Sequence, residues 1–153
     1  MEARYRIRPA RQRDLDAIVE VENASFGSDA YDRKLFAAYL RTCEGLFLVA
    51  ESGGELRGYS VTRATGGRAE LISIAVDPPA RGRGAASALL RSTLRRLCRR
   101  KVGHLMLMVK LDNTAARQFY EKFQFAKVRV VRGYYEDGAD GCMLRKDLTG
   151  PTQ

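Results

Sequence analysis

The chain has 153 residues, a length that suits one domain, and 45% of them are hydrophobic, enough to fill a single core. We therefore expect one domain over residues 1–153. No apolar run approaches the roughly 20 residues that cross a bilayer, and the charged segment 1–10 lacks the apolar centre of a signal peptide. These features predict a soluble, cytoplasmic protein without a membrane partner.

The balance of charge is strongly basic, with 27 Lys and Arg against 18 Asp and Glu and a formal net charge of +9. Such an excess fits a nucleic acid, an acidic protein partner, a phosphorylated cofactor or merely a genome rich in Arg codons, and charge alone does not distinguish these explanations. The densest basic run, 95–101, closes a predicted helix, where cations complement the negative end of the helix dipole. We interpret the run as helix-stabilising and expect no nucleic-acid partner.

The three cysteines, Cys43, Cys98 and Cys142, are odd in number and widely spaced. They form neither a CxxC pair nor a Cys/His ligand pattern. The sequence therefore predicts free thiols and no metal.

The first half of the chain predicts three strands and two helices. Alternating apolar and charged residues indicate the first strand, which Pro9 ends, and Asp14 can cap the first helix. Because Gly53 and Gly54 reach positive φ without penalty, the runs that flank them should pair as an antiparallel hairpin. In chain order, the elements are a strand at 4–8, helices at 14–26 and 32–41, and strands at 46–50 and 56–63.

The second half predicts a strand, a helix and a strand with a parallel pair. The run 71–76 is apolar on both faces, as in a strand that is covered on both sides. From Gly84 the apolar residues repeat with the period of a helix, which Gly103 ends. The strand that follows should run parallel to 71–76. The remaining elements are a strand at 104–109, a helix capped by Asn113, and strands at 125–131 and 142–147.

A glycine-rich loop between the strand at 71–76 and the following helix carries the clearest functional signal. Unpaired backbone N–H groups and the positive end of the helix dipole meet there, which suits a diphosphate. Gly82 and Gly84 leave room for phosphate oxygens, while Arg81 and Arg83 add mobile positive charge. The loop lacks the Gly-Lys-Ser/Thr of a P-loop and the three-glycine dinucleotide fingerprint, which leaves other pyrophosphates, coenzyme A among them.

Two motifs in order resemble the GNAT superfamily of N-acetyltransferases. Arg81-x-x-Gly84-x-Ala86, at the start of a helix after 74–78, is similar to the family's motif A. The opening 6–10 is also typical of the family. The residues similar to its second motif are Val109, Asn113, Ala116, Phe119, Tyr120 and Phe125.

This resemblance implies an α/β (α+β) fold whose mixed, mostly antiparallel sheet has about six to seven strands. It implies a central parallel pair splayed at the cofactor site, with helices on both faces of the sheet. Acetyl-coenzyme A is the implied cosubstrate, with no metal. The residues implied in its binding are Ile74, Ala75, Val76, Arg81, Gly82, Arg83, Gly84, Ala85, Ala86, Asn113, Ala116 and Tyr120.

Two further segments, 22–26 with Tyr31 and 134–138, resemble the protein N-terminal acetyltransferases, including the bacterial ribosomal-protein alanine acetyltransferase. The resemblance implies that they flank a peptide slot; the alternative is that their aromatic rings only pack between loops. Met108 stands where that subfamily usually has Glu or His, Gln124 replaces a Gly, and Ala86 replaces the commoner Gly. The expected substrate-binding residues are Phe26, Tyr31, Met108, Tyr134 and Tyr135.

Acetyl transfer needs a neutral amine and a protonated or stabilised thiolate. Glu70 lies 11 residues before Arg81, a spacing that resembles the catalytic glutamate of the histone acetyltransferase branch. In phase with apolar neighbours of its strand, it would be partly desolvated, with a raised pKa. Glu70 is the expected base, and the alternatives are an exposed pair with an Arg, or a water chain.

Tyr120 matches the family tyrosine that hydrogen-bonds the coenzyme A sulfur, and its expected role is to protonate the thiolate. The alternative is a place in the apolar stripe of its helix.

We therefore expect an enzyme that transfers acetyl from acetyl-coenzyme A directly to a primary amine in a ternary complex, most of all to a protein N-terminal α-amine. A small-molecule amine as acceptor is one alternative. A non-catalytic acyl-coenzyme A binding module is another, because of Met108. The sequence leaves a monomer and a homodimer equally open.

Overall fold

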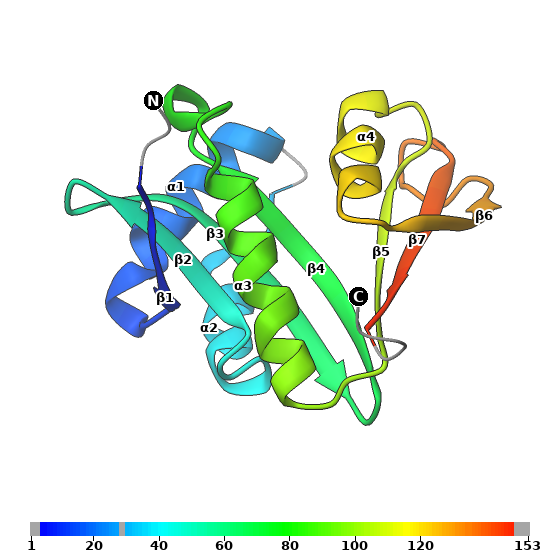
Figure 1. Ribbon diagram of the computed structural model, residues 1–153. Coiled ribbons are helices and arrows are strands. Elements are labelled where there is room, and N and C mark those ends of the chain that lie inside the picture. The colour runs from blue at the N-terminus through cyan, green and yellow to red at the C-terminus, as the bar shows by residue number, and fades with distance from the viewer. Residues whose placement is uncertain (1–3, 28–29, 149–153) are drawn as a thin grey trace.

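The computed structural model describes residues 4–27 and 30–148. Seven strands form one sheet in the order β1-β2-β3-β4-β5-β7-β6 (Figure 1). All neighbours are antiparallel except β4 and β5, so the expected mixed, mostly antiparallel sheet with one parallel pair is confirmed. The strands are β1 (Arg6–Pro9), β2 (Phe47–Ser52), β3 (Glu55–Thr65), β4 (Arg68–Val76), β5 (His104–Lys110), β6 (Ala126–Val131) and β7 (Gly141–Asp147).

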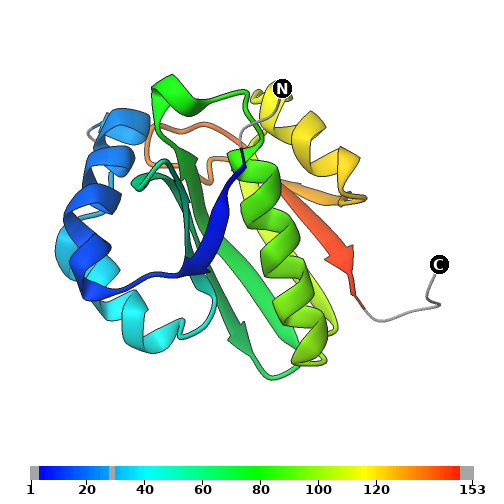
Figure 2. The ribbon, with the colours of Figure 1, turned by 60° about the vertical axis from the view of Figure 1, so that its left-hand side comes forward.

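Helices cover both faces of the sheet, as expected (Figure 2). On one face, Asp32 caps the N-terminus of the helix at Arg33–Thr42, because its carboxylate accepts a hydrogen bond from Leu35 N at 2.9 Å. On the other face, Leu89, Leu90 and Leu97 form a fully buried stripe. The helices are α1 (Leu15–Phe26), α2 (Arg33–Thr42), α3 (Ala85–Arg99) and α4 (Thr114–Lys122), with short 3-10 turns at Gln12–Asp14 and Pro78–Ala80.

The core is divided by the sheet. Side chains of α1 and α2 pack on the face that carries Val49, Tyr59 and Val61. The opposite face is filled from α3 and α4, in a cluster that includes Leu105 and Leu107 of β5. No helix in the described ranges is long and apolar enough to span a membrane.

An ion-pair network fixes β1 to the start of α1. The expectation that Asp14 caps α1 through its side chain is wrong, because its carboxylate is bound elsewhere. It accepts hydrogen bonds from Arg8 at 2.8 and 2.9 Å and from Arg11 N at 2.8 Å, while Arg8 also reaches Glu51 at 3.2 Å. The Arg8 guanidinium therefore holds the pKa of Asp14 below its usual range.

The substitution Asp14→Asn should lower the free energy of unfolding by about 2 kcal/mol at pH 7, because Arg8 is left half-paired in a largely buried position. Since the folded-state pKa of Asp14 is depressed, its contribution exists above the unfolded pKa of about 3.9 and is lost as the pH falls. Urea unfolding from pH 7 to pH 3 should show the difference from wild type shrinking. As a control, Asp16→Asn removes an exposed pair with Arg33 and should change stability by about 0.5 kcal/mol or less.

Candidate active site between the splayed strands

The two central parallel strands separate after three residue pairs. Arg68–Glu70 of β4 pair with His104–Met106 of β5, and from Leu71 onward β4 has a strand partner only in β3. β5 continues to Lys110 with β7 as its partner. The backbone groups of β4 on the side of β5 are therefore free to bind an extended ligand, in the region that holds Ile74, Ala75 and Val76.

The glycine loop lies at the end of this open strand. Gly82 and Gly84 adopt φ of 79° and 92°, a left-handed region that favours glycine, and Gly84 is the N-cap of α3. A Cβ added at Gly82 would meet no atom within 4 Å, so the loop is open on its outer side. With Ala85 and Ala86 in the first turn of α3 and no acidic residue there, the loop can hold an anion by its N–H groups.

Arg81 holds the loop in place. Its Nε donates to the Val76 carbonyl at 3.1 Å, and its Nη2 donates to Ser25 Oγ of α1, also at 3.1 Å. The expectation of a mobile charge is therefore wrong for Arg81, because its guanidinium ties the loop to β4 and α1. Arg83 is exposed, and within the described ranges it has no ion-pair partner.

Helix α4 brings a tyrosine to the β5 side of the opening. Asn113 caps the helix by accepting a hydrogen bond from Ala116 N at 3.0 Å, as expected. Tyr120 is 5% exposed and packs edge-on against Phe119 and Phe125, with ring centroids 5.1 and 5.5 Å away. Burial raises the pKa of Tyr120, so its phenol is neutral and can donate a proton. The hydroxyl has no hydrogen-bond partner in the described part of the chain.

Glu70 is not desolvated, contrary to the expectation. Its side chain is 55% exposed and pairs with Arg63 at 3.1 Å. A β-bulge between Leu71 and Ser73 puts Ile72 out of the ladder, so Glu70 and Ile72 are not in phase with Ile74 as expected. Ile74 packs with the α3 face of the sheet, whereas Ile72 packs with the α1 face. A catalytic role for Glu70 stays a prediction, without the desolvation that would support it.

A different carboxylate is buried next to the opening. Glu22 of α1 is 1% exposed and accepts hydrogen bonds from Tyr31 N at 2.8 Å and from the Tyr59 hydroxyl. The Tyr59 hydroxyl also lies 2.9 Å from Ser73 Oγ of β4. Burial raises the pKa of Glu22, while the hydrogen bonds from Tyr59 and Tyr31 oppose that rise.

The sequence contains a signal for the burial of Glu22 that lies in its helical spacing and not in a motif. Glu22 follows Leu15 and Ile18 at positions i, i+3 and i+7, which is the buried stripe of α1. A carboxylate in an apolar stripe is costly unless it is hydrogen-bonded or protonated, and such residues concentrate at functional sites.

The expected substrate residues come together in part. Tyr134 and Tyr135 pack edge-on, with ring centroids 4.9 Å apart. Burial raises the pKa of Tyr31, with Glu22, Tyr134 and Glu70 adding to it, and burial, Tyr134 and Tyr31 raise the pKa of Tyr135 to about 12. The three phenols therefore lie within electrostatic range of one another. Phe26, 42% exposed at the end of α1, has no ring contact with them in the described ranges.

Met108 belongs to the same group through Gly141. A Cβ at Gly141 would lie 2.9 Å from Met108 Sδ and 3.1 Å from Tyr134 Cβ, so both side chains meet over this glycine. The loop between β6 and β7 is held by Lys110, which pairs with Asp137 at 3.0 Å and lies 5.4 Å from the centre of the Tyr135 ring. No group of three metal-ligating side chains occurs within the described residues.

Comparison with known proteins shows the family to which the chain belongs. Residues 13–125 match the model of the Acetyltransferase (GNAT) family. The chain belongs to that family. An N-alpha-acetyltransferase of Sulfurisphaera tokodaii is 31% identical to it, over 94% of this chain and 93% of the relative. The N-alpha-acetyltransferase RimI of Mycobacterium tuberculosis is 32% identical, over 91% and 90%.

A solved structure has the same GNAT fold. Ard1 from Thermoplasma volcanium matches with a TM-score of 0.90 at 23% identity, over 95% of this chain and 99% of that one. Together with the family match and the named relatives, the fold makes the protein a GNAT acetyltransferase, an enzyme of the N-acetyltransferase type.

The contact over Gly141 gives a testable prediction. Gly141→Ala should force Met108 and Tyr134 to move, which we expect to cost about 1–2 kcal/mol of unfolding free energy and to change the near-UV circular dichroism of the tyrosines. Gly67→Ala is the matched control, because a Cβ at Gly67 meets nothing within 4 Å. Equal effects of the two substitutions on stability and spectrum would contradict the packing of the slot described here.

Proposed function

We propose that the protein transfers an acetyl group from acetyl-coenzyme A to the α-amine of a protein N-terminus. The observation that carries the proposal is the group of Tyr31, Tyr134 and Tyr135, in which Tyr31 is connected with Ser73 of β4 through Glu22 and Tyr59. Phenol hydroxyls can bind the backbone of an extended peptide, whereas a small amine needs no such platform. Two relatives with about a third of their residues identical bear the name N-alpha-acetyltransferase, which supports the same acceptor here.

The cosubstrate fits the residues that surround the opening. The N–H groups at Gly82–Ala86 suit its diphosphate, and the free backbone of Ile74, Ala75 and Val76 suits the amides of its pantetheine arm. Asn113 and Ala116 lie at the N-terminal end of α4, the helix that follows β5. A chain of this fold from Salmonella typhimurium, with a TM-score of 0.83 at 19% identity, was solved with acetyl-coenzyme A.

The acceptor slot runs between the end of α1 and the β6–β7 loop. Met108 and Tyr134 give it an apolar side, and Tyr31 and Tyr135 give it hydroxyl groups. Phe26 follows Ser25, which Arg81 of the diphosphate loop contacts, and we assign its exposed ring to the end of the slot nearest that loop.

In the proposed reaction, the neutral amine attacks the thioester carbon, so that a C–N bond forms and the C–S bond breaks. The nitrogen loses one proton, and we assign this proton to Glu22, which the Tyr59 and Ser73 hydroxyls connect with β4. The departing thiolate takes a proton from Tyr120, whose buried phenol is neutral at pH 7. Solvent then restores both groups, and the products are an amide and a free thiol.

The acceptor class can be tested with the full-length protein. Incubation with acetyl-coenzyme A and peptides with free N-termini should release thiol and add one acetyl group to the α-nitrogen, as seen by mass spectrometry. The same peptides with a blocked N-terminus and a free Lys should not react. Turnover with polyamines or aminoglycosides, but with no peptide of the panel, would overturn the proposed acceptor and leave a small-amine acetyltransferase.

The cofactor loop can be tested separately from turnover. Gly84→Val should lower coenzyme A affinity at least about 100-fold by calorimetry, because a side chain would fill the space of the diphosphate and strain a φ of 92°. Gly66→Val is the matched control, since Gly66 also has a positive φ, of 62°, in the β3–β4 turn, with no atom within 4 Å of an added Cβ. Unchanged affinity in Gly84→Val would refute the assignment of the loop.

The two carboxylates can be told apart by their effect on kcat. Glu22→Gln should lower kcat about 100-fold at pH 7.5 with little change in KM, whereas Glu70→Gln should change kcat less than about threefold. The pKa of Glu22 is raised, so its carboxylate is lost as the pH falls, and the wild-type kcat should fall with it. In Glu22→Gln, kcat should not show this fall at low pH. A large loss in Glu70→Gln instead would restore Glu70 as the base.

A further inference from the structure

The excess positive charge of the chain is confined to one segment. From Pro78 to Leu111 there is no acidic residue, and these 34 residues contain nine Lys and Arg. The other 119 residues contain 18 basic and 18 acidic side chains and are formally neutral. The whole net charge of +9 therefore belongs to α3 and the segments on either side of it.

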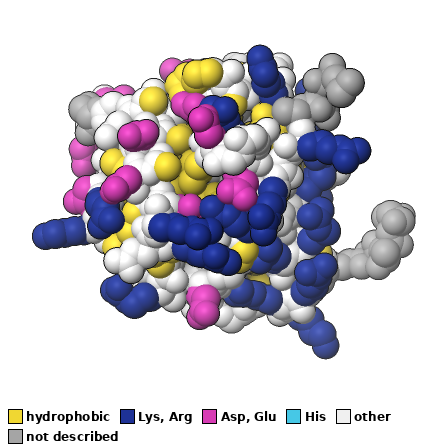
Figure 3. Space-filling view, turned by 90° about the vertical axis from the view of Figure 1, so that its left-hand side faces the viewer, with side chains coloured by type: hydrophobic (Ala, Val, Ile, Leu, Met, Phe, Trp, Pro, Cys, Tyr) yellow, Lys and Arg dark blue, Asp and Glu magenta, His cyan; other side chains and the backbone are white. Residues whose placement is uncertain are grey.

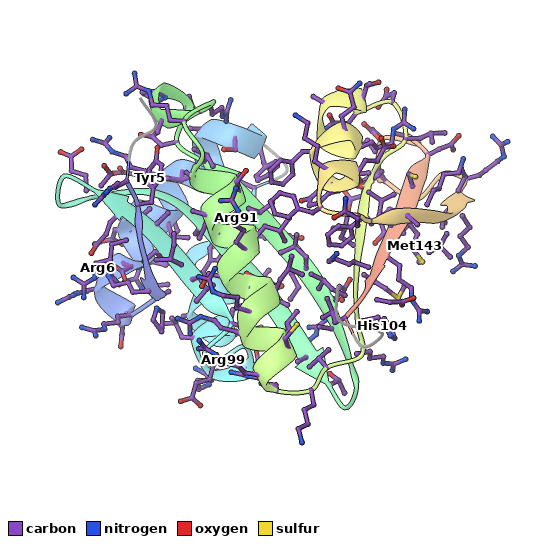
Figure 4. The ribbon with its side chains drawn as sticks, in the orientation of Figure 1. Tyr5, Arg6, Arg91, Arg99, His104 and Met143 are labelled. Carbon is purple, nitrogen blue, oxygen red and sulfur yellow. The ribbon has the colours of Figure 1, made fainter. Side chains whose placement is uncertain are left out.

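Part of this charge is carried by four exposed residues on α3 and just after it, here named the basic face: Arg91, Arg95, Arg99 and Lys101. All four side chains are exposed, and the three arginines follow at i, i+4 and i+8, on one side of α3. Figure 4 shows Arg91 and Arg99 on this helix. In Figure 3, Lys and Arg side chains form a column along the edge of the molecule where α3 lies.

Contacts within the protein do not account for the basic face. Arg96 and Arg100 have structural partners, since they donate to the carbonyls of Gly45 and Glu44 at 3.2 and 2.8 Å. The four residues of the basic face form no ion pair within the described ranges, although Arg91 lies 5.9 Å from the centre of the Phe123 ring.

The helix dipole explains only the last turn of α3, because its effect falls off within that turn, and Arg91 and Arg95 precede it. Repulsion between the cations is evident at Arg96, whose pKa is lowered by burial and by Arg99, Arg100 and Arg95. The interpretation of the run 95–101 as helix-stabilising therefore covers part of the charge, and the rest needs another explanation.

The surroundings of the basic face favour one class of partner. A protein interface needs apolar residues at its centre, and the large exposed hydrophobic side chains of the described chain, Phe26, Val128 and Tyr134, are all outside α3. A membrane-surface helix needs a free apolar face, but that of α3 is buried on the sheet. Arg91 lies beside the Phe123 ring, whereas Arg95 and Arg99 present exposed guanidinium forks, which suit phosphates. We propose that the basic face binds the phosphate backbone of a nucleic acid.

The proposal is independent of the acetyl-transfer site. Along the helix axis, Arg95 and Arg99 lie about 16 and 22 Å from Gly84, which is beyond the diphosphate loop. Variants at these two positions therefore leave the proposed cofactor and acceptor sites untouched.

The test measures binding of the full-length protein to fluorescein-labelled 20-base-pair duplexes by anisotropy. RNA and DNA duplexes of the same sequence distinguish the two sources of phosphate backbone. The wild type should bind at least one of them, with affinity falling steeply as salt rises. Arg95→Gln with Arg99→Gln should weaken binding about tenfold at low salt and reduce the slope of log affinity against log salt by about 1.8, at about 0.9 for each lost phosphate contact.

A matched control removes the same charge elsewhere. Arg6→Gln with Arg145→Gln deletes two exposed arginines that pair with Glu51 and Asp147, and its affinity should stay within about twofold of wild type. Equal weakening in both double variants would overturn the proposal, because net charge alone would then explain binding. Wild-type affinity in Arg95→Gln with Arg99→Gln would also overturn it, as would binding of polyglutamate with no binding of either duplex.

Discussion

The loss of backbone pairing between β4 and β5 is the constraint on which the rest of the site depends. β4 keeps its ladder with β3 as far as Val76, while β5 leaves it after Met106 and continues with β7. Each of the two diverging strands is followed by a different part of the site. The glycine loop and α3 follow β4, and α4 with Tyr120 follows β5, so a ligand between the strands meets both. An open strand edge in the middle of a sheet is costly unless something pairs with it, which favours an extended ligand there.

The sequence predicted those parts of the fold that depend on local patterns. The hairpin at Gly53 and Gly54, the stripe of α3, the cap at Asn113 and the strand–loop–helix order around Gly82 and Gly84 are set by neighbours along the chain, and the structure confirms each of them. The errors arose where distant segments meet. A bulge in β4, set by its pairing with β3, takes Glu70 out of phase with Ile74, and Arg81 binds Ser25 of α1, 56 positions away.

Glu22 and Met108 show why the chemistry of the site was harder to predict than its cofactor loop. Met108 stands on β5, at the position where the resemblance led us to expect Glu or His, and its thioether lies over Gly141, as does Tyr134. The buried carboxylate is instead on α1, and its environment depends on Tyr59 of β3 and on Tyr31 N. The proton acceptor that we propose, Glu22, therefore lies on a different element from Met108, which is consistent with an apolar side chain at position 108. A motif within one strand cannot predict that a base expected on that strand is replaced by a carboxylate on a distant helix.

Amide hydrogen exchange along β4 tests the central claim most directly. Alternate amides of 71–76 point toward β5 and have no strand partner there, so they should exchange rapidly in the free protein. Saturating coenzyme A should protect them, together with the amides of 82–86, while the amides of 71–76 that pair with β3 change little. Protection of other segments, with no change in 71–76, would contradict the account in which the open edge of β4 binds the cosubstrate.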